Sequence, residues 1–257
     1  METVSHRGRT TAYRLSDRGG GRPTVLFVHG SGGTHGAWKG QFRLSGEFPV
    51  AAVDLSGHGE STDVDADPGW GALSAYADDV LAVAETVDAD VLVGNSLGGA
   101  VAMHVALERD ADIDGLGLVG TGARLSVLED LRVWLQEDFE QAVAFLHEPG
   151  KLFYDAPEEY VELSKEEMYE TGQATTARDF LTCDGVDVRD RVGEIDLPAL
   201  AVTGEHDKLT PPWYHEFLAE EMPSCDWTTI DDAAHLSMLE RPEAFNETLS
   251  AFLTDLR

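Results

Sequence analysis

The sequence predicts an α/β fold, in which a mostly parallel central sheet carries helices on both of its faces. Short apolar runs alternate along the chain with segments whose apolar residues recur at helical spacing, which is the pattern of repeated strand–helix–strand units. Residues 24–30 are apolar almost throughout, as a strand buried on both faces of a parallel sheet is. The length of 257 residues suits one such domain with an insertion.

The N-terminal half of the chain is predicted to contribute four strands and two helices. The expected strands are residues 11–15, 24–30, 48–54 and 89–96, and the expected helices are residues 73–88 and 98–108. The C-terminal part is predicted to add three strands and a closing amphipathic helix. These strands are expected within residues 114–122, 198–212 and 225–235, and the helix at residues 242–256.

Between residues 123 and 195 the alternation stops. Three segments there have helical patterns, and no convincing strand separates them. An all-helical block inside an α/β chain predicts an inserted lid. The expected organisation is therefore a core of residues 1–122 and 196–257 with a helical lid of residues 123–195. The alternative is a pair of ordinary crossover helices with loops.

Acidic residues far outnumber basic ones, with 48 Asp and Glu against 18 Lys and Arg and a formal net charge of −30. They are spread from end to end, which predicts an acidic surface over the whole fold rather than an acidic tail. Such a surface repels nucleic acid, whose phosphates require a basic face. Because salt screens the repulsion among these acidic groups, we interpret the charge as an adaptation to high salt, of the kind seen in halophilic, acidic proteomes. The alternative is a basic partner or substrate, which predicts one acidic patch.

No segment has the pattern of a membrane span or an export signal. No apolar run reaches about 18 residues, and the N-terminal residues lack the apolar centre of a secretory signal. Cys183 and Cys225 are too few for a disulfide framework, and neither lies in a metal-binding cluster. We therefore expect a cytoplasmic protein with reduced cysteines.

Ser96 is the candidate nucleophile. Residues 94–98 read Gly-Asn-Ser-Leu-Gly, which fits the G-x-S-x-G pattern of a serine held on a sharp strand-to-helix turn. The expected strand before it and the expected helix after it supply the context that this pattern requires. Small flanking residues relieve the crowding of a strained backbone, and the hydroxyl then projects above the strand ends. The alternative is a plain glycine turn with a solvent-facing serine.

His235 and Asp207 are the candidate base and acid that would activate Ser96. Each follows an expected strand, so both lie at the sheet edge where open α/β folds place their sites. A carboxylate there orients the imidazole and stabilises the imidazolium. Asp231 and Asp232 are nearer to His235 in the sequence but are expected to face water.

Two backbone amides are candidates for an oxyanion hole. The Leu97 N–H lies just after the nucleophile at a helix N-terminus. The Ser31 N–H lies in the turn His-Gly-Ser-Gly-Gly, whose glycines let the backbone approach a substrate closely. His29 and His58 also lie at strand ends and are expected to brace loops rather than to act as bases.

Five motifs together resemble those of the α/β-hydrolase family in its lidded, single-domain form. They are HGSGG, DLSGHGES, GNSLGG, GEHDKLTPP and AAHLSMLERPEAF, and they occur in the family's order. The resemblance implies a Ser-His-Asp hydrolase with an acyl-type intermediate and with no metal or organic cofactor. It also implies that Asp54 is structural or borders the site. Ser96 stands where epoxide hydrolases and haloalkane dehalogenases carry an aspartate, which argues against both activities.

The expected function is a serine hydrolase of small-molecule substrates, namely small to medium carboxylic esters, thioesters or lactones. One alternative is C–C bond hydrolysis of ring-cleavage-type diketones, or a lyase reaction with the same triad, since the elbow and the HGSGG turn also resemble those enzymes. The other alternative is a non-catalytic ligand-binding protein on the same fold.

The lid is expected to set the substrate specificity through an apolar pocket. Arg124 and Arg178 either receive an anionic substrate or form ion pairs. The sequence leaves the role of Asn95, next to the nucleophile, open. The residues expected to line the pocket are Trp134, Phe139, Phe153 and Met168.

Overall fold

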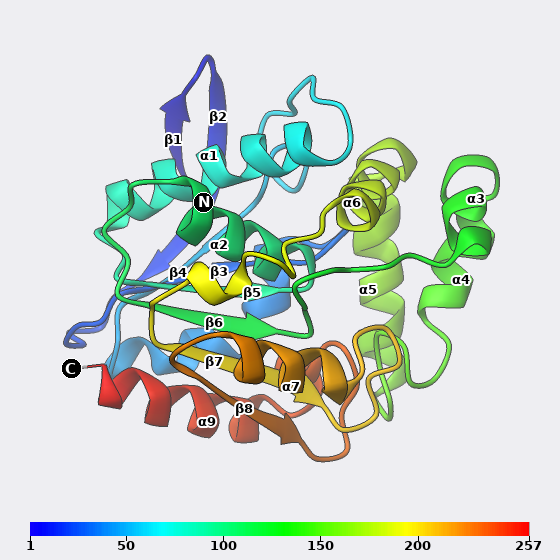
Figure 1. Cartoon of the computed structure of the whole chain (residues 1–257). Helices are drawn as coiled ribbons and strands as arrows, with labels where there is room; N and C mark the ends of the chain where they lie inside the picture. The colour runs from blue at the N-terminus through cyan, green and yellow to red at the C-terminus, as the bar shows by residue number, and fades with distance from the viewer. Residues whose placement is uncertain (257) are drawn as a thin grey trace.

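The computed structural model describes residues 1–256, which contain a central sheet of eight strands (Figure 1). The strand order is β1-β2-β4-β3-β5-β6-β7-β8. β2 runs antiparallel to both β1 and β4, whereas the remaining neighbours pair in parallel. Together with the helices on both faces, this arrangement confirms the predicted α/β class.

The elements follow the expected alternation, with small differences at their ends. The strands are β1 (Glu2–His6), β2 (Arg9–Ser16), β3 (Val25–Val28), β4 (Val50–Val53), β5 (Val91–Asn95), β6 (Gly115–Val119), β7 (Ala199–Gly204) and β8 (Cys225–Ile230). The helices are α1 (Trp70–Val87), α2 (Leu97–Glu108), α3 (Glu129–Glu137), α4 (Phe139–Leu146), α5 (Glu158–Thr171), α6 (Gln173–Gly185), α7 (Pro212–Glu221), α8 (Ser237–Glu240) and α9 (Pro242–Asp255). Short 3-10 helices are η1 (His35–Trp38), η2 (Gln41–Gly46) and η3 (Val192–Glu194).

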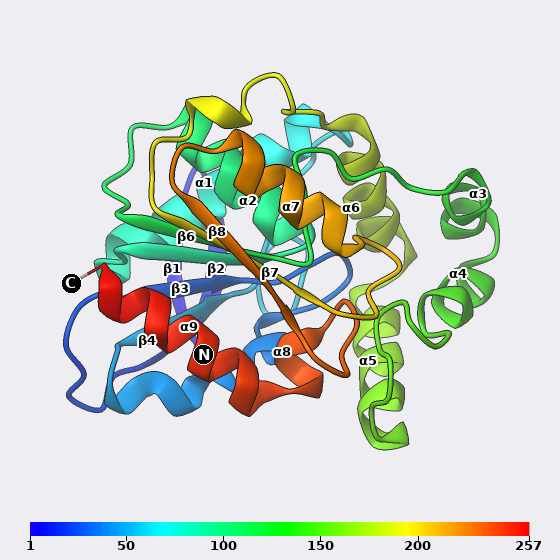
Figure 2. The same cartoon turned by 60° about the horizontal axis from the view of Figure 1, so that its bottom comes forward.

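Each face of the sheet carries its own hydrophobic core. Successive strand residues point to opposite faces, so Leu26 and Val28 of β3 enter one core while Val25 and Phe27 enter the other. The first core packs against α1, α2 and α7, and the second packs against α9, η1 and η2. Figures 1 and 2 show α1 and α9 on opposite sides of the sheet. Because helices cover both faces of the sheet, a site is expected at the carboxyl ends of the parallel strands.

Four helices, α3 to α6, lie between β6 and β7, where the sequence predicts only helices. We call this group the helical insertion. Its helices pack around their own apolar cluster, in which Leu135, Leu146 and Met168 are buried. In Figures 1 and 2 the insertion lies beyond the carboxyl ends of the parallel strands. It therefore faces the edge of the sheet at which the candidate catalytic residues are expected.

Sequence reasoning missed β1, α7 and α8. The prolines before α7 have the pattern of a loop, yet Pro212 occupies the first turn of that helix, where a fixed φ and a missing N–H are tolerated. β1 is an edge strand with mostly exposed side chains, so it carries little apolar signal.

Within residues 1–256, none of the helices combines the length and the apolar character needed to cross a bilayer.

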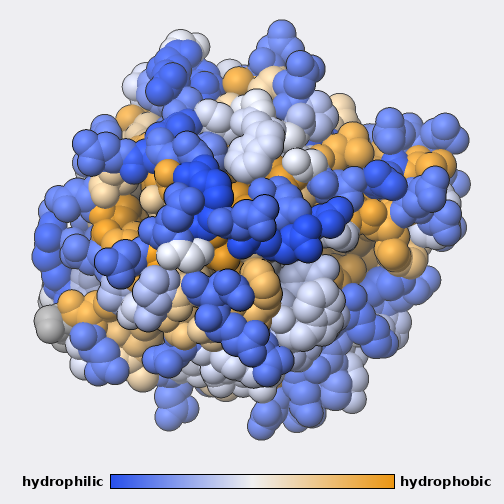
Figure 3. Space-filling model, in the orientation of Figure 1, coloured by the Kyte–Doolittle hydropathy of each residue, from blue (hydrophilic) through white to orange (hydrophobic). Residues whose placement is uncertain are grey.

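The surface is largely hydrophilic. Hydrophilic side chains cover most of the face in Figure 3, and smaller hydrophobic groups show between them, including on the side where α3 and α4 lie. Exposed acids occur on helices all round the fold, for example Glu85, Glu137, Glu159, Glu220 and Glu247. The negative charge is therefore distributed over the described residues rather than confined to one element.

Candidate active site

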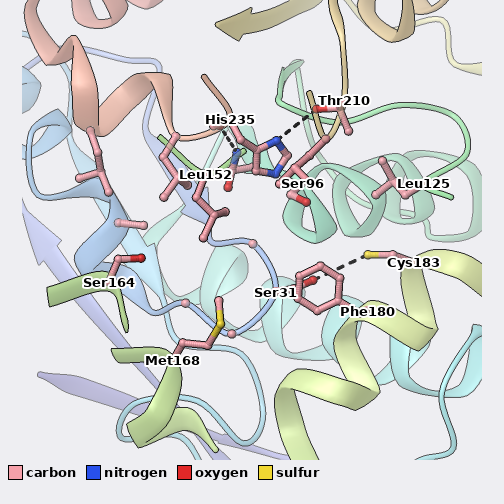
Figure 4. A pocket seen from close by; sticks show the side chains of 18 of the residues that line it. Ser31, Ser96, Leu125, Leu152, Ser164, Met168, Phe180, Cys183, Thr210 and His235 are labelled. Atoms are coloured by element: carbon pink, nitrogen blue, oxygen red, sulfur yellow. Dashed lines mark hydrogen bonds between the residues drawn. The ribbon is translucent and has the colours of Figure 1, made fainter. Parts of the chain in front are cut away.

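A cavity of about 720 Å³ lies between the carboxyl ends of the parallel strands and the helical insertion (Figure 4). Its lining includes Ser31, Ser96 and His235 from the sheet edge. Met168 of α5 and Phe180 of α6 line it from the opposite side. The candidate nucleophile, the candidate base and one candidate oxyanion donor are thus brought to one place.

Ser96 joins β5 to α2 in a strained backbone conformation. Its φ is 54° and its ψ is −114°, a combination that residues other than glycine rarely adopt. Hydrogen bonds on both sides hold this conformation: the Ser96 N–H donates to Val119 O at 2.8 Å, and Ser96 O accepts Thr121 Oγ1 at 2.8 Å as well as two N–H groups in the first turn of α2. The side chain points into the cavity (Figure 4).

Glycine is required at positions 94 and 98 for a steric reason. A Cβ on Gly94 would lie 2.2 Å from the backbone carbon of Gly98, and a Cβ on Gly98 would lie 2.3 Å from Val28 O. Both obstacles are backbone atoms of packed elements, which cannot give way as the end of a flexible side chain can. The G-x-S-x-G pattern therefore lets α2 begin directly against β5 and β3.

Asp207 and His235 meet through a buried hydrogen bond of 2.9 Å between Oδ2 and Nδ1. Asp207 Oδ1 also accepts the N–H groups of Leu209 and Thr210 at 2.8 and 2.9 Å. Burial opposes ionisation, but the His235 ring and these hydrogen bonds hold the Asp207 pKa below its ordinary value. An ionised Asp207 keeps the ring proton on Nδ1, and the imidazole lies beside Ser96 in Figure 4.

Sequence reasoning missed Thr210, which contacts both of these side chains. Its Oγ1 donates to Asp207 Oδ2 at 2.8 Å and lies 3.2 Å from His235 Nδ1. The sequence does place Thr210 three residues after Asp207. An aspartate side chain often accepts the backbone N–H groups of the residues that follow it within this distance. The Asp207 carboxylate therefore lies between the loop that contains Thr210 and the imidazole of His235.

Ser31 and Leu97 offer the backbone donors that the sequence suggested. Within residues 1–256 neither amide has a protein acceptor, whereas the N–H groups of Gly32 and Gly33 are both bonded. Leu97 is the first residue of α2, where the helix dipole favours negative charge. Two unpaired amides of this kind, one from each side of Ser96, suit the stabilisation of an oxyanion.

His29 and His58 brace loops, as expected. His29 Nε2 accepts the Leu55 N–H at 3.1 Å, and its Nδ1 lies 2.8 Å from Gly30 O. Burial and the neighbouring His58 lower the pKa of His29 to about 4, so its ring is neutral at neutral pH. His58 Nε2 lies 2.8 Å from Asp179 Oδ2 in a fully buried contact.

Three other aspartates, two weighed as the acid and one expected to be structural or to border the site, lie in different surroundings from Asp207. Asp231 and Asp232 are exposed on the loop before His235. Asp54 is buried and accepts both the backbone N–H and the ring Nδ1 of His35 at 2.8 Å. Within the described part of the chain, no hydrogen bond joins any of these three acids to His235.

Asn95 and the helical insertion hold the loop that carries His235. Asn95 Nδ2 donates to His235 O at 3.3 Å, and the His235 N–H donates to Lys151 O at 3.2 Å. Glu240 accepts the Ala234 N–H on Oε2 at 2.7 Å, and the N–H groups of Tyr154 and Asp155 on Oε1 at 2.9 and 3.0 Å. The side chain of Asn95 therefore affects the site by holding the loop that carries His235.

Glu240→Gln is expected to lower the free energy of unfolding by about 1–3 kcal/mol, because an amide has only one oxygen to accept these three N–H groups, of which that of Ala234 is buried. Such a loss corresponds to a decrease in Tm of roughly 2–12 °C for a chain of this size. Thermal unfolding of Glu240→Gln beside Glu247→Gln, an exposed glutamate of α9, measures the difference. Equal Tm values for the two variants would show that the three contacts contribute no stability.

Met168 lines the cavity, whereas three aromatic residues that were expected to line it do not. Among residues 1–256 the cavity lining does not include Trp134, Phe139 or Phe153. The Trp134 ring packs on Phe145 with centroids 5.3 Å apart, Phe139 packs edge-on against a tyrosine of α5, and Phe153 is buried in the apolar cluster of the insertion. An apolar residue at helical spacing packs equally well on a neighbouring helix, so periodicity cannot identify a pocket.

Arg124 and Arg178 form ion pairs. The Arg178 guanidinium donates to Asp63 Oδ1 at 2.7 Å and to Tyr76 OH at 3.0 Å. Arg124 lies 3.9 Å from Asp187. Neither side chain lines the cavity among the described residues, so the anion-receiving alternative is not supported for either.

Comparisons with known proteins bear on this geometry. Residues 25–248 match the sequence profile described as "Alpha/beta hydrolase family". A protein of Agrobacterium fabrum (strain C58 / ATCC 33970), provisionally named a carbamate hydrolase, is 28% identical over 245 residues, covering 90% of this chain and 93% of that protein.

Two solved structures superpose closely. A thermophilic esterase has a TM-score of 0.87 and 32% identity, covering 99% of this chain and 97% of that one. An N-acyl homoserine lactone degrading enzyme has a TM-score of 0.86 and 26% identity, covering 98% of this chain and 100% of that one. Each of these similarities extends over nearly the whole chain.

Proposed function

The chain belongs to the alpha/beta hydrolase family and is a hydrolase, and from this premise we propose that it is a serine hydrolase of carboxylic esters, thioesters and lactones. Ser96 is the nucleophile, His235 the general base, and Asp207 the carboxylate that orients His235. One observation carries the proposal: the buried 2.9 Å contact of Asp207 with His235 lies beside a serine in a strained backbone at the cavity wall. The esterase and lactonase relatives support the substrate class.

The proposed reaction has two halves that share the same groups. Ser96 Oγ attacks the carbonyl carbon while His235 Nε2 takes the hydroxyl proton. The N–H groups of Ser31 and Leu97 receive the oxyanion, and the intermediate then expels the alcohol or thiol, which takes the proton from His235. Water, deprotonated by His235, attacks the acyl-enzyme, and the second intermediate then expels Ser96 Oγ, which takes the proton back from His235 as the acid is released. Asp207 stays ionised throughout and stabilises the imidazolium.

We also propose that residues 123–195 form a lid over a core of residues 1–122 and 196–257. The separate apolar cluster of α3–α6 and the contribution of Met168 and Phe180 to the cavity support this division. The cavity lining also contains Glu166, Glu167 and Glu170 of α5. Lys39 and Lys208 also line the cavity, so three carboxylates face two ammonium groups. In a chain of net charge −30, this balance disfavours anionic acyl groups and favours neutral ones.

Ester turnover and covalent labelling test the proposed function. In molar KCl the protein is expected to hydrolyse 4-nitrophenyl esters and neutral lactones with saturation, and to lose this activity on treatment with a fluorophosphonate. Such a reagent bonds only to an activated serine, so mass spectrometry should find one label on the peptide containing Ser96. Absence of both turnover and labelling would refute a serine hydrolase. A label on another serine would refute Ser96 as the nucleophile.

A further inference from the structure

The peptide that presents the Ser31 N–H is held at its carbonyl end. Gly30 O accepts the Gly33 N–H at 3.2 Å and lies 2.8 Å from His29 Nδ1. Because His29 Nε2 accepts the Leu55 N–H, the ring proton is on Nδ1 and is donated to Gly30 O. In a planar trans peptide the C=O and the N–H point in opposite directions. The bonds to Gly30 O therefore anchor the N-terminal side of the peptide that carries the Ser31 N–H.

The following peptide, between Ser31 and Gly32, is held by the helical insertion. The Gly32 N–H donates to Asp179 Oδ2 on α6 at 2.9 Å. Gly32 has a φ of +70°, and a Cβ there would lie 3.2 Å from Met168 of α5 and from Thr176 of α6. The insertion thus contacts the turn through close packing and through one hydrogen bond.

Asp179 is fully buried and is held at both carboxylate oxygens. Oδ2 also bonds His58 Nε2 at 2.8 Å, and Oδ1 accepts the Tyr76 hydroxyl at 2.6 Å. Burial opposes the charge on Asp179, but His58 and the hydrogen bonds lower its pKa, while Asp179 raises the pKa of His58 against the effect of burial. The acceptor of the Gly32 N–H is therefore an ionised carboxylate that water does not reach.

We propose that Asp179 is a positioning residue that holds the oxyanion turn so that the Ser31 N–H faces the reacting carbonyl. This inference rests on the proposed function, and Asp179 acts through Gly32 without touching the substrate. Without this acceptor, the turn retains Gly30, Gly32 and Gly33, whose backbones rotate easily, and the Ser31 N–H points away from the reacting carbonyl for part of the time. Because Asp179 belongs to α6, the helical insertion contributes to the catalytic geometry as well as to the shape of the cavity.

Asp179→Ala removes the acceptor and is expected to lower kcat by about 10- to 100-fold with KM within about threefold, since an oxyanion donor acts in the transition state. Asp179→Asn keeps one oxygen that can accept the Gly32 N–H, so it should recover most of the loss. Rates are divided by the concentration of Ser96 titrated with the fluorophosphonate, so that unfolded molecules do not count. Affinity for a trifluoromethyl ketone, which forms an oxyanion on the serine, should fall in Asp179→Ala together with kcat/KM.

Thr176→Val is the matched control. Thr176 packs on the same glycine from the same helix, and its Oγ1 has no hydrogen-bond partner among residues 1–256. Valine keeps the shape and removes only an unpaired hydroxyl, so kcat and the ketone affinity should stay at wild-type values. An equal loss in Thr176→Val would show that helix packing, and not the carboxylate, holds the turn, and would overturn the inference.

A wild-type kcat in Asp179→Ala would also overturn the inference that Asp179 positions the oxyanion turn. If Asp179→Ala does not fold, Tyr76→Phe takes its place, because it removes the hydroxyl that donates to Oδ1 and keeps the carboxylate; it also removes the acceptor of the Arg178 Nε–H. This variant should lose about three- to tenfold in kcat at unchanged KM, and an unchanged kcat would count against Asp179. A wild-type protein that neither turns over esters nor labels at Ser96 refutes the proposed function instead, so the two failures are distinguishable.

Discussion

Ser96→Ala is expected to lower kcat for ester hydrolysis by about 10⁴-fold or more, leaving the residual rate that an oxyanion hole and binding alone provide. The variant should fold, because alanine is smaller than serine and is held in the same strained turn by the Ser96 N–H bond to Val119 O, which it retains. KM should change little, since the hydroxyl makes its new bond only during the reaction. The measurement is steady-state turnover of a 4-nitrophenyl ester in molar KCl, with circular dichroism to confirm folding.

Ser164→Ala is the comparison for this variant. Ser164 also lines the cavity, but its hydroxyl bonds His147 and it has no strained backbone. Its loss should change kcat by less than about threefold. Comparable activity in Ser96→Ala and Ser164→Ala would exclude Ser96 as the nucleophile.

Asp207→Asn belongs to the same prediction and is expected to reduce kcat by about 10⁴-fold, because an amide in that place favours the wrong imidazole tautomer. Asp231→Asn and Asp232→Asn are the matched controls, since both acids are exposed on the base's own loop. They should retain nearly full activity. If either of them lost activity while Asp207→Asn kept it, the assignment of the acid would be wrong.

Thermal stability is expected to rise steeply with salt, and this is the second large effect. A net charge of −30 spread over the fold opposes compaction. Raising KCl from about 0.1 M to 1 M shortens the Debye length from about 10 Å to about 3 Å, which screens most of this repulsion. A gain of about 3 kcal/mol would raise Tm by roughly 6–12 °C for a chain of this length.

Differential scanning calorimetry at several KCl concentrations measures this shift. Sucrose at matched osmolality is the control, because it favours compact states without screening charge. A Tm that is the same in dilute buffer and in molar KCl would refute the halophilic interpretation. A rise that sucrose reproduces fully would assign the effect to solvent exclusion rather than to charge.

The nucleophile turn could be predicted from the sequence because its causes are local. Gly94, Ser96 and Gly98 lie within five consecutive residues, and the clash that excludes a side chain at Gly94 is with the start of the following helix. The clash at Gly98 is with the backbone of β3 and adds a reason that the pattern alone does not reveal. The order of strands and helices was also predictable, since periodicity reports burial residue by residue. Asp207 and His235 were predictable as candidates because each directly follows a strand.

The contacts of the site were not predictable in the same way. Thr210 required the loop geometry around Asp207, and the bond from Asp179 to Gly32 joins residues 147 positions apart. Trp134 and Met168 both lie in segments with helical patterns, yet of these two only Met168 lines the cavity. Which side of a helix meets the cavity depends on how α3–α6 pack on one another.

The sequence by itself therefore determined the α/β class, the strained turn at Ser96 and the order of the candidate triad, because these follow from sterics and burial within short segments. Only the tertiary structure decided that Asp207 rather than Asp231 meets His235, that Arg178 pairs with Asp63, and that Asp179 reaches the oxyanion turn. The physical reason is that hydrogen bonds and ion pairs act over a few ångströms. Packing of distant segments alone brings such groups within that range.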